Sequence, residues 1–355
     1  MNLVDRDAIV TREGLIFRVL GYSHPRDSYF CDLEYAPSRI FGSRNPKSPR
    51  GEVETTHSKF YENEAWEFLR AQYPEYLIEH KALGTRVVGV RRAQIKETRK
   101  PEDALRRLMD LEPGDALIES MQKVVAIVEQ RFGIGSGHLG VFGSLLHGFH
   151  HPDLSDIDLT VYGRENVQKL LHALSGAYRV TDFTLHNEFE NRPSIVTKKW
   201  KFLNYAAEEY FWHQRRKLIY AIYQSQENGR SVKVEFEPVK SRIEVVNDYD
   251  EQTKIKRKGW ARIIAKVSSD EDSPFIPSLY GLEPEEVVDG PREARDVERV
   301  VSYMEEFRLQ AVAGERIYVE GNLEEVVSPR GSHLQIALTY CPRYYEQVLK
   351  KCDRV

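Results

Sequence analysis

Two aspartates separated by one apolar residue are the part of the sequence best suited to chemistry. Asp156 and Asp158 lie in the run LSDIDLTVYG (154–163), whose apolar and polar alternation predicts a β-strand. Because residues i and i+2 of a strand project from the same face, the two carboxylates would stand side by side and repel each other. A cation between them would relieve that repulsion. Mg²⁺, with Mn²⁺ as the alternative, binds carboxylate oxygens and keeps positions for water and phosphate oxygens.

A glycine-serine pair lies shortly before these aspartates. Gly143 and Ser144 follow a short apolar stretch, and Gly148 comes four residues after Ser144. A Gly-Ser turn at the start of a helix presents backbone N–H groups and a hydroxyl to an anion, with no Cβ in the way at the glycine. Phosphate donors would therefore lie at one end of the stretch and metal-binding carboxylates at the other, a combination that suits phosphoryl or nucleotidyl transfer.

The whole stretch VFGSLLHGFHHPDLSDIDLTVYG (141–163) resembles the signature of the nucleotidyltransferase superfamily, which includes DNA polymerase beta, tRNA nucleotidyltransferases and the minimal nucleotidyltransferases. With its flanking helices the resemblance covers about a quarter of the chain. The general layout also resembles predicted nucleotidyltransferases of archaea. The resemblance implies nucleotide binding at Gly143, Ser144 and Gly148, and catalysis and metal binding at Asp156 and Asp158.

The superfamily often supplies a third carboxylate from a later strand, in an apolar-acid-apolar context. The strand-like run SVKVEFEPV (231–239) offers Glu235 and Glu237, both on its polar face. Val234-Glu235-Phe236 matches the pattern better, so Glu235 is the predicted third catalytic and metal-binding carboxylate. It would complete a two-metal site or act as base on the attacking hydroxyl, and the sequence does not separate these roles.

The chain departs from the family pattern at one informative place. Many relatives carry Arg directly after Gly-Ser, whereas this chain has Leu145, Leu146 and His147 there. If that Arg contacts the triphosphate, its absence weakens nucleotide binding unless a Lys or Arg reaches the site from elsewhere, and it favours the alternative of a non-catalytic binding protein on the same fold. The spacing from Ser144 to Asp156 is also about one residue longer than usual, which a loop absorbs.

Two other features suggest chemistry, and the sequence favours the plainer interpretation of each. His147, His150 and His151 have loose spacing and no cysteine beside them, so we expect loop residues near the substrate and no structural zinc. Basic residues cluster at 43–50, 86–100, 197–201, 215–217 and 254–258. Such clusters are usually solvated surface, and direct contact of 197–201 or 215–217 with substrate is the less favoured alternative.

Elements that would position these residues can be predicted from periodicity. Apolar residues recur at helical spacing over 116–132, and a second helix is expected over 165–176, closed by Gly176. A long helix rich in aromatic and basic residues is expected over about 203–227, followed by the strand 231–239. Residues 41–51, rich in Gly, Ser and Pro, predict a mobile loop.

The predicted fold class is α+β, with a nucleotidyltransferase-type mixed sheet and helices. We expect a β-containing N-terminal domain (1–100), a nucleotidyltransferase core (115–250) and a small β-rich, barrel-like C-terminal domain (255–355). Residues 8–35 predict a small antiparallel sheet, and 100–115, with two prolines around one short helix, predict a linker. Apolar alternation over 308–314 and 316–327 supports the third domain.

Composition and charge limit the class of protein and the cellular compartment that the sequence predicts. At 355 residues, 41% apolar and with a net charge of −4, the chain has a globular profile and is not a generally basic nucleic-acid binder. It has no apolar run of membrane-spanning length, so no membrane is expected. Its first residues lack signal-peptide character and its three cysteines show no disulfide or zinc spacing, which predicts the reducing cytoplasm.

The predicted function is a Mg²⁺-dependent nucleotidyltransferase. It would move a nucleoside monophosphate from a nucleoside triphosphate such as ATP to an acceptor hydroxyl, with release of pyrophosphate. The identity of the acceptor stays open, with RNA or DNA as one candidate, and so do base preference and oligomeric state. Two alternatives remain: a metal-dependent phosphohydrolase that uses the same carboxylates, and a non-catalytic nucleic-acid-binding protein on the same fold.

Overall fold

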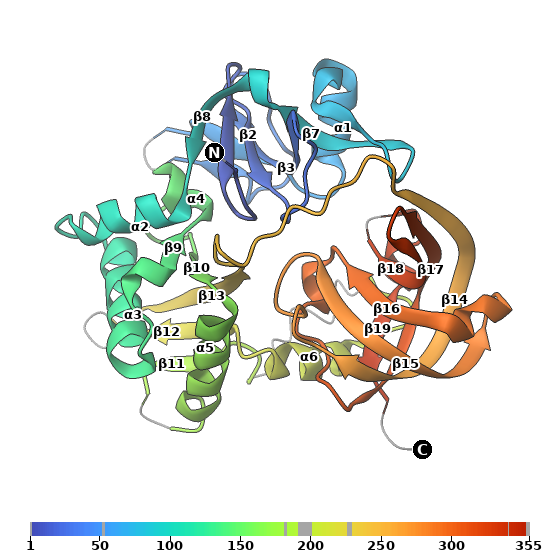
Figure 1. Ribbon diagram of the computed structural model, residues 1–355. Coiled ribbons are helices and arrows are strands. Elements are labelled where there is room, and N and C mark those ends of the chain that lie inside the picture. Colours follow the sequence, from blue (N-terminus) through green and yellow to red (C-terminus); the bar gives the residue numbers. More distant parts are fainter. Residues whose placement is uncertain are drawn as a thin grey trace. The chain divides into compact units, whose positions relative to one another are not determined.

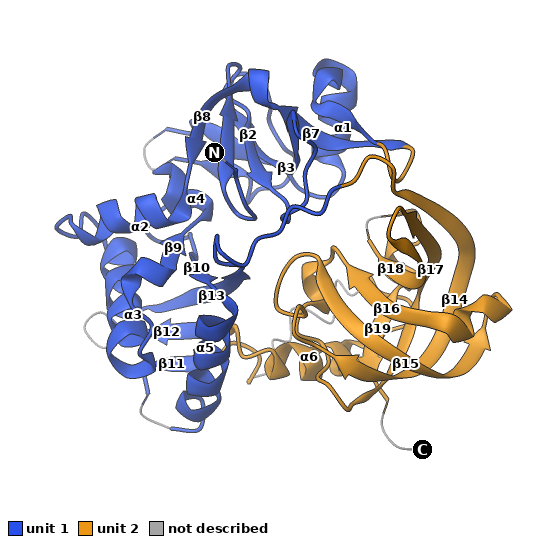
Figure 2. Ribbon diagram, in the orientation of Figure 1, with its two compact units in different colours: residues 1–80, 85–186, 221–249 blue, residues 81–84, 187–220, 250–355 orange. Residues whose placement is uncertain are grey.

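The structure, a computed structural model, describes residues 2–51, 54–180, 183–190, 201–225, 229–339 and 341–352. Within these ranges it contains three β-sheets and six α-helices, which confirms the predicted mixed α+β class. The chain divides into two compact units, residues 1–80, 85–186 and 221–249 in the first, and 81–84, 187–220 and 250–355 in the second (Figure 2). No helix among the described residues is both long and apolar enough to cross a membrane.

The N-terminal part of the first unit is an eight-stranded sheet (Figure 1). Its path is β4-β5-β3-β2-β1-β8, with β7 on β3 and β6 on β7. Helix α1 (Glu64–Gln72) places Phe68 and Leu69 in the core of this sheet. The strands are β1 (Ala8–Thr11), β2 (Ile16–Val19), β3 (Ser28–Pro37), β4 (Pro49–Arg50), β5 (His57–Lys59), β6 (Leu77–His80), β7 (Thr85–Arg91) and β8 (Ile95–Arg99).

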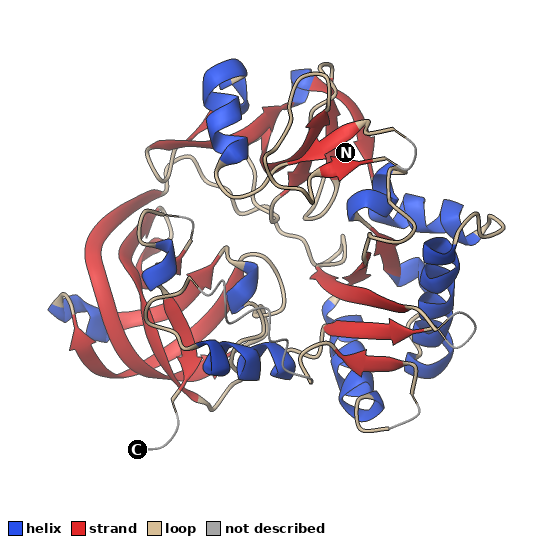
Figure 3. Cartoon of the chain, turned by 180° about the vertical axis from the view of Figure 1, so that it is seen from behind, coloured by secondary structure: helices blue, strands red, loops and turns tan. Residues whose placement is uncertain are grey.

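The second sheet carries the predicted site. Its strand order is β11-β12-β13-β10-β9, with β10 parallel to β13 and antiparallel to β9. The helices α3 and α5 pack against each other, and α5 also packs against β10 and β13 (Figure 3). The elements are α3 (Ala116–Phe132), β9 (Leu139–Val141), α4 (Gly143–His147), β10 (Ile157–Tyr162), α5 (Arg164–Ala177), β11 (Leu185–Asn187), β12 (Tyr220–Gln224) and β13 (Ser231–Val239).

Helix α3 has the bounds that its periodicity predicts. Its apolar residues at helical spacing, among them Met121 and Val125, are fully buried. Asp115 caps its start, where the carboxylate accepts hydrogen bonds from the N–H groups of Leu117 and Ile118 at 2.8 and 3.0 Å. Gly133 ends the helix in the left-handed conformation. Periodicity and both caps agree, which explains why this element is predictable.

The segment predicted as a linker is packed into the first unit. It forms helix α2 (Pro101–Met109), which lies directly on β9. A Cβ added to Gly140 of β9 would lie 2.6 Å from the Cβ of Pro101 and 2.5 Å from the Thr160 hydroxyl oxygen. The glycine therefore permits the close approach of helix and strand.

Three predicted elements were wrong in extent. Helix α5 continues through Gly176 to Ala177. The segment 203–227 is not one helix: α6 spans Ala207–Arg216, Leu218 adopts a positive φ of 59°, and β12 follows. The strand forms because alternate residues, including Ala221 and Tyr223, are buried in the sheet, so tertiary packing overrides the local helical pattern. Residues 308–314 form no strand.

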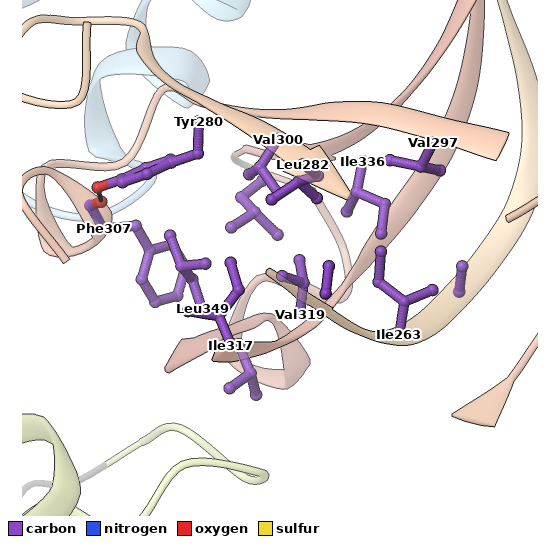
Figure 4. Packing of buried hydrophobic residues seen from close by; sticks show 14 of the residues in the cluster. Ile263, Tyr280, Leu282, Val297, Val300, Phe307, Ile317, Val319, Ile336 and Leu349 are labelled. Carbon is purple, nitrogen blue, oxygen red and sulfur yellow. Dashed lines mark hydrogen bonds between the residues drawn. The ribbon is translucent and has the colours of Figure 1, made fainter. Parts of the chain in front are cut away.

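The second unit is built around a six-stranded sheet in the order β14-β15-β16-β18-β17-β19, and β14 pairs with β17 as well as β15, so the sheet closes on itself. Its interior is apolar, and Figure 4 shows residues such as Ile263, Val300 and Ile336 pointing toward one another. The strands are β14 (Lys254–Ser269), β15 (Ser278–Asp289), β16 (Val297–Ser302), β17 (Arg316–Ser328), β18 (Gly331–Leu338) and β19 (Val348–Lys351).

Candidate active site

Two neighbouring strands bring the predicted carboxylates together. In the parallel pair β10–β13, Asp158 lies opposite Glu235. The adjacent residues Ile157, Leu159 and Val234 are fully buried, which fixes the register and turns the carboxylates to the opposite face of the sheet. Asp156 directly precedes β10, two residues before Asp158.

The electrostatics of Asp158 reflect this crowding. Burial raises the pKa of its carboxyl well above the usual range, and the neighbouring Glu235 and Asp156 raise it further, whereas the Lys59 ammonium opposes the shift. Like charges held on adjacent strands disfavour simultaneous ionisation. Burial and the neighbouring carboxylates thus outweigh the effect of Lys59 at Asp158.

Asp156 lies in a more basic environment. Burial raises the pKa of its carboxyl as well. Cations from two parts of the first unit act in the opposite direction, of which Lys233 of β13 is the strongest. The other three come from the N-terminal sheet and from the turn that precedes β4: Lys59, Arg50 and Lys47.

Lys233 shows where positive charge is favoured. Its ammonium is ion-paired with Glu235 and stabilises the charged form of Asp156. Among the described residues, no group of three or more His, Cys, Asp or Glu side chains is arranged to hold a metal ion. The carboxylates of Asp156, Asp158 and Glu235 nevertheless suit a hard divalent cation. The Lys233 ammonium, which pairs with Glu235 and stabilises charged Asp156, already shows that a positive group is favoured beside them.

The Gly-Ser turn is held against the same carboxylates. Gly143 begins α4 with φ 65°, and a Cβ there would lie 2.4 Å from the Asp158 Oδ2. The Phe142 N–H donates to the Asp158 carbonyl at 3.0 Å. Ser144 is buried, and its carbonyl accepts a hydrogen bond from Phe149 N at 3.2 Å. The structure therefore brings Gly143 beside Asp158, and Ser144 follows it in the turn.

Gly148 lies apart from this group. It ends α4 in the left-handed conformation (φ 71°), and its N–H donates to the Leu145 carbonyl at 3.3 Å. Nothing lies within 4 Å of a Cβ built there. With Asp115, His150 and others it lines an open cavity of about 440 Å³. The structure gives Gly148 the role of a helix C-cap.

Glu237, the alternative third carboxylate, has a different partner. Its Oε2 accepts a hydrogen bond from Arg6 Nη2 at 2.7 Å, and both residues are buried. The Arg6 guanidinium also lies 5.3 Å from the ring centroid of Phe142. The sequence contains no signal for this ion pair, because the residues are 231 positions apart.

The three histidines have separate local partners. His147 Nδ1 lies 3.1 Å from Arg99 Nη1, and burial, assisted by the nearby Arg99 and His57, lowers the pKa of His147 to about 3. His150 Nε2 lies 2.9 Å from an oxygen of Asp115. The third, His151, accepts a hydrogen bond from the backbone N–H of Asp153 at 3.1 Å. At neutral pH, α4 therefore ends in an uncharged imidazole.

The basic segment 43–50, predicted as a mobile loop, contributes to the site. Its end forms β4, which pairs with β5. The Arg50 and Lys59 side chains lie over the ring of Tyr35, 5.9 and 6.0 Å from its centroid. The same ring packs on Phe149, which follows α4, at 4.9 Å. The clustering of basic residues was visible in the sequence, but its position beside the carboxylates was not.

Other basic clusters are engaged within the second unit. Arg216 Nη2 lies 2.6 Å from a carboxylate oxygen of Glu315. Lys217 is buried, and its ammonium donates to the Glu306 carbonyl at 2.6 Å. Lys198 and Lys199 lie outside the described residues. These contacts favour a structural role for the cations at the end of α6.

Comparison with known proteins agrees with this geometry. Residues 121–249, from α3 to the segment after β13, match the family model of the nucleotidyltransferase domain, which confirms the resemblance inferred from the sequence. The chain is similar to an uncharacterized protein of the archaeon Methanocaldococcus jannaschii, with 26% identity over 334 residues that cover 93% of each chain. No solved structure matches it.

Proposed function

We propose that this chain, which carries a nucleotidyltransferase domain at residues 121–249, is a Mg²⁺-dependent nucleotidyltransferase that transfers a nucleoside monophosphate, with ATP as the first donor to test, to an acceptor hydroxyl. The observation that carries the proposal is the placement of Asp158 beside Glu235 on paired strands, with Gly143 against Asp158. A purely structural role would not explain why the carboxylates of Asp158 and Glu235 are kept together next to Gly143.

The Gly-Ser turn is the proposed phosphate-binding element. At Gly143 the absence of a side chain leaves the backbone accessible next to Asp158. The Gly143 and Ser144 N–H groups and the Ser144 hydroxyl are donors suited to the oxygens of the β- and γ-phosphates. Gly148, one of the residues that the family resemblance implies, would act indirectly by ending α4 and so fixing the turn.

Asp156, Asp158 and Glu235 are the proposed ligands of Mg²⁺, or of Mn²⁺. When bound, the cation would neutralise charge on the phosphates and orient the reacting oxygens. Glu235, and not Glu237, is the proposed third ligand because Glu237 is already paired with Arg6. When the cation binds, it would replace the Lys233 ammonium as the partner of the Glu235 carboxylate.

In the proposed reaction the acceptor hydroxyl oxygen attacks the α-phosphorus, the bond from that phosphorus to the bridging oxygen breaks, and pyrophosphate leaves. The hydroxyl proton passes to a carboxylate of the site. The side chains of the chain itself position the phosphates and hold the developing negative charge close to cations, so no covalent side-chain nucleophile is needed.

The proposed acceptor is RNA or DNA. Lys254 and Arg257 at the start of β14 are exposed, as a phosphate backbone would require, although a cationic strand end is also common on ordinary surfaces. Among the described residues, Cys31, Cys341 and Cys352 form no disulfide, which supports the reducing cytoplasm as the compartment we propose.

The proposal is tested by incubating the full chain with Mg²⁺, α-labelled nucleoside triphosphates and mixed RNA, DNA and protein acceptors. We expect label transfer and stoichiometric pyrophosphate, both lost in Asp156→Asn with Asp158→Asn. Transfer that persists in this double variant would refute the site assignment. Phosphate release without transfer would identify a phosphohydrolase, and nucleic-acid binding without metal-dependent turnover would identify a binding protein.

Metal binding has a readout that is independent of activity. Mg²⁺ or Mn²⁺ should raise the melting temperature of the wild-type chain, because the cation relieves repulsion that exists only in the folded state. The Asp156→Asn, Asp158→Asn variant should show no such rise. Glu237→Gln is the matched control, since its carboxylate belongs to the Arg6 pair, and its metal-induced rise should persist.

A further inference from the structure

We propose that the hairpin of β4 and β5 in the N-terminal sheet supplies the cations that bind the triphosphate of the nucleotide, with Lys59 as the principal contact and Arg50 and Lys47 beside it. This inference rests on the proposed function and deepens it. It assigns part of the nucleotide site to residues outside 121–249, the segment that matches the nucleotidyltransferase domain.

The need for outside cations follows from α4. The positions after Gly143 and Ser144 are held by Leu145 and Leu146, both buried. His147, the last residue of α4, is kept uncharged because its pKa is lowered to about 3. The helix that begins the phosphate-binding turn therefore brings no positive side chain to a highly charged anion.

The hairpin is fixed next to that turn by direct contacts. The Gly51 N–H donates to the carbonyl of Phe149, just beyond α4, at 3.2 Å. The rings of His57 and Phe149 lie 4.8 Å apart, and Tyr35 of β3 packs on Phe149 at 4.9 Å. Lys59 lies opposite Tyr35 in the β3–β5 pairing. The cationic hairpin and the Gly-Ser turn thus belong to one packed structure.

The hairpin is also internally ordered. The Lys59 N–H donates to the Ser48 carbonyl at 2.9 Å, and the Ser48 hydroxyl donates to the Lys59 carbonyl at 2.7 Å. Arg50 Nη1 donates to the carbonyls of Lys47 and Pro49 at 2.6 and 2.9 Å. A site built on paired strands holds its side chains more firmly than an unpaired loop would.

The local contacts of the hairpin cations include uncharged groups. The partners of Arg50 Nη1 are uncharged carbonyls. Glu34, the acidic residue nearest in sequence to Tyr35, is ion-paired with Arg18 at 3.5 Å. The Arg50 and Lys59 cations lie 5.9 and 6.0 Å from the ring centroid of Tyr35, which packs on Phe149 just beyond α4.

The triphosphate is the ligand that this charge fits. Three carboxylates and a triphosphate together carry more negative charge than two divalent cations neutralise, so further cations are needed at the phosphates. A nucleic-acid acceptor would present one charge per phosphate along an extended strand. The hairpin instead concentrates three cations beside the Gly-Ser turn, where the β- and γ-phosphates are proposed to lie.

The test measures binding of Mg²⁺-tripolyphosphate, which lacks base and ribose, by titration calorimetry with the full chain. We expect Lys59→Met to weaken binding at least about tenfold, the loss of one charge-assisted hydrogen bond. Lys59→Arg should retain most of the affinity. Lys47→Gln, an exposed change that does not threaten folding, should weaken binding about threefold. The control is Arg86→Ala with Lys96→Ala, which removes two exposed cations from the same sheet and should change nothing.

In steady state, Lys59→Met should raise the KM for the nucleoside triphosphate more than it lowers kcat. Unchanged tripolyphosphate affinity in both Lys59→Met and Lys47→Gln would overturn the inference while leaving the proposed function intact. Loss of affinity for a single-stranded RNA oligonucleotide, with tripolyphosphate affinity unchanged, would overturn it in favour of an acceptor site. Wild-type binding of tripolyphosphate that depends on Lys59, without label transfer to any acceptor, would support the inference and refute the proposed function.

Discussion

Two glutamates on β13 lie on the same face of the strand, two residues apart, and have opposite environments. Glu235 lies opposite Asp158 of β10, a like charge. Glu237 lies opposite the neutral Thr160 and is neutralised by Arg6. One end of the strand pair therefore gathers carboxylates that repel one another, and the other end is closed as a buried ion pair.

The difference teaches how to separate chemistry from structure in this fold. Burial of a charged group is costly unless a partner accompanies it. At Glu237 the fold provides that partner from the N-terminal segment, 231 residues away. At the other end, Glu235 and Asp156 add repulsion to Asp158, and Glu235 itself is paired with the partly exposed Lys233. The fold neutralises Glu237 with a buried arginine but gathers Asp156, Asp158 and Glu235 at the other end, as the proposed cation site would require.

Replacing each glutamate by glutamine tests directly whether Glu235 serves catalysis and Glu237 serves stability. Glu237→Gln leaves the Arg6 charge buried without its partner, so we expect a loss of about 3–5 kcal/mol in the free energy of unfolding. The kcat of the folded protein should change little. Glu235→Gln should lower kcat about a hundredfold or more and leave stability equal or higher, because a repulsive charge is removed. Urea unfolding and the label-transfer assay measure both effects.

The double variant Arg6→Met with Glu237→Leu is the control for this prediction. It removes both charges of the pair and should recover most of the stability that Glu237→Gln loses. Equal effects of Glu235→Gln and Glu237→Gln on kcat, or a larger loss of stability for Glu235→Gln, would remove the distinction between the two ends of β13.

The pH dependence of stability tests the end of the strand pair where Glu237 is buried with Arg6. Burial is the main cause that raises the pKa of Asp7, next to Arg6, to about 7, whereas an aspartate in an unfolded chain titrates near ~3.9. Between these values the folded protein holds a proton that the unfolded chain has released. Raising the pH from about 4 to about 7 therefore removes stability, by up to about 4 kcal/mol from this group.

Asp7→Asn imitates the protonated acid and should abolish this contribution. The urea concentration at the unfolding midpoint should decrease between pH 5 and pH 8, and the decrease should be smaller for Asp7→Asn than for the wild type. Asp27→Asn changes an exposed aspartate in the turn before β3, and its urea midpoint should decrease as much as that of the wild type. Parallel pH profiles for the wild type and Asp7→Asn would show that Asp7 is ionised in the folded protein throughout this range.

The parts of the fold that local pattern determines were predictable from the sequence. Helix α3 has apolar periodicity, an Asp115 cap and Gly133 after it, and these signals agree. The aromatic run after α6 has a helical pattern too, but Leu218 turns the chain and β12 joins the sheet. That choice depends on β13 as a neighbour, which no short window of sequence contains.

The same limit applies to the candidate site. Gly143, Ser144, Asp156 and Asp158 are close in sequence, so their order carries information, and the structure brings Gly143 beside Asp158. The choice between the two glutamates of β13 depends on Arg6. The cations near Asp156 depend on the pairing of β3 with β5. Such long-range contacts leave no periodic trace in the sequence.

The two glycines of α4 give the smallest and most closely matched test. Gly143 and Gly148 have nearly equal positive φ values, 65° and 71°, so alanine should impose about 1 kcal/mol of backbone strain at each. Only at Gly143 would the added Cβ meet a neighbour, the Asp158 Oδ2 at 2.4 Å. Gly143→Ala should therefore cost about 1–3 kcal/mol more in the free energy of unfolding and abolish label transfer, while Gly148→Ala keeps a measurable rate. Similar losses of transfer in the two variants would mean that strain in α4, and not the approach of the turn to Asp158, is what the site requires.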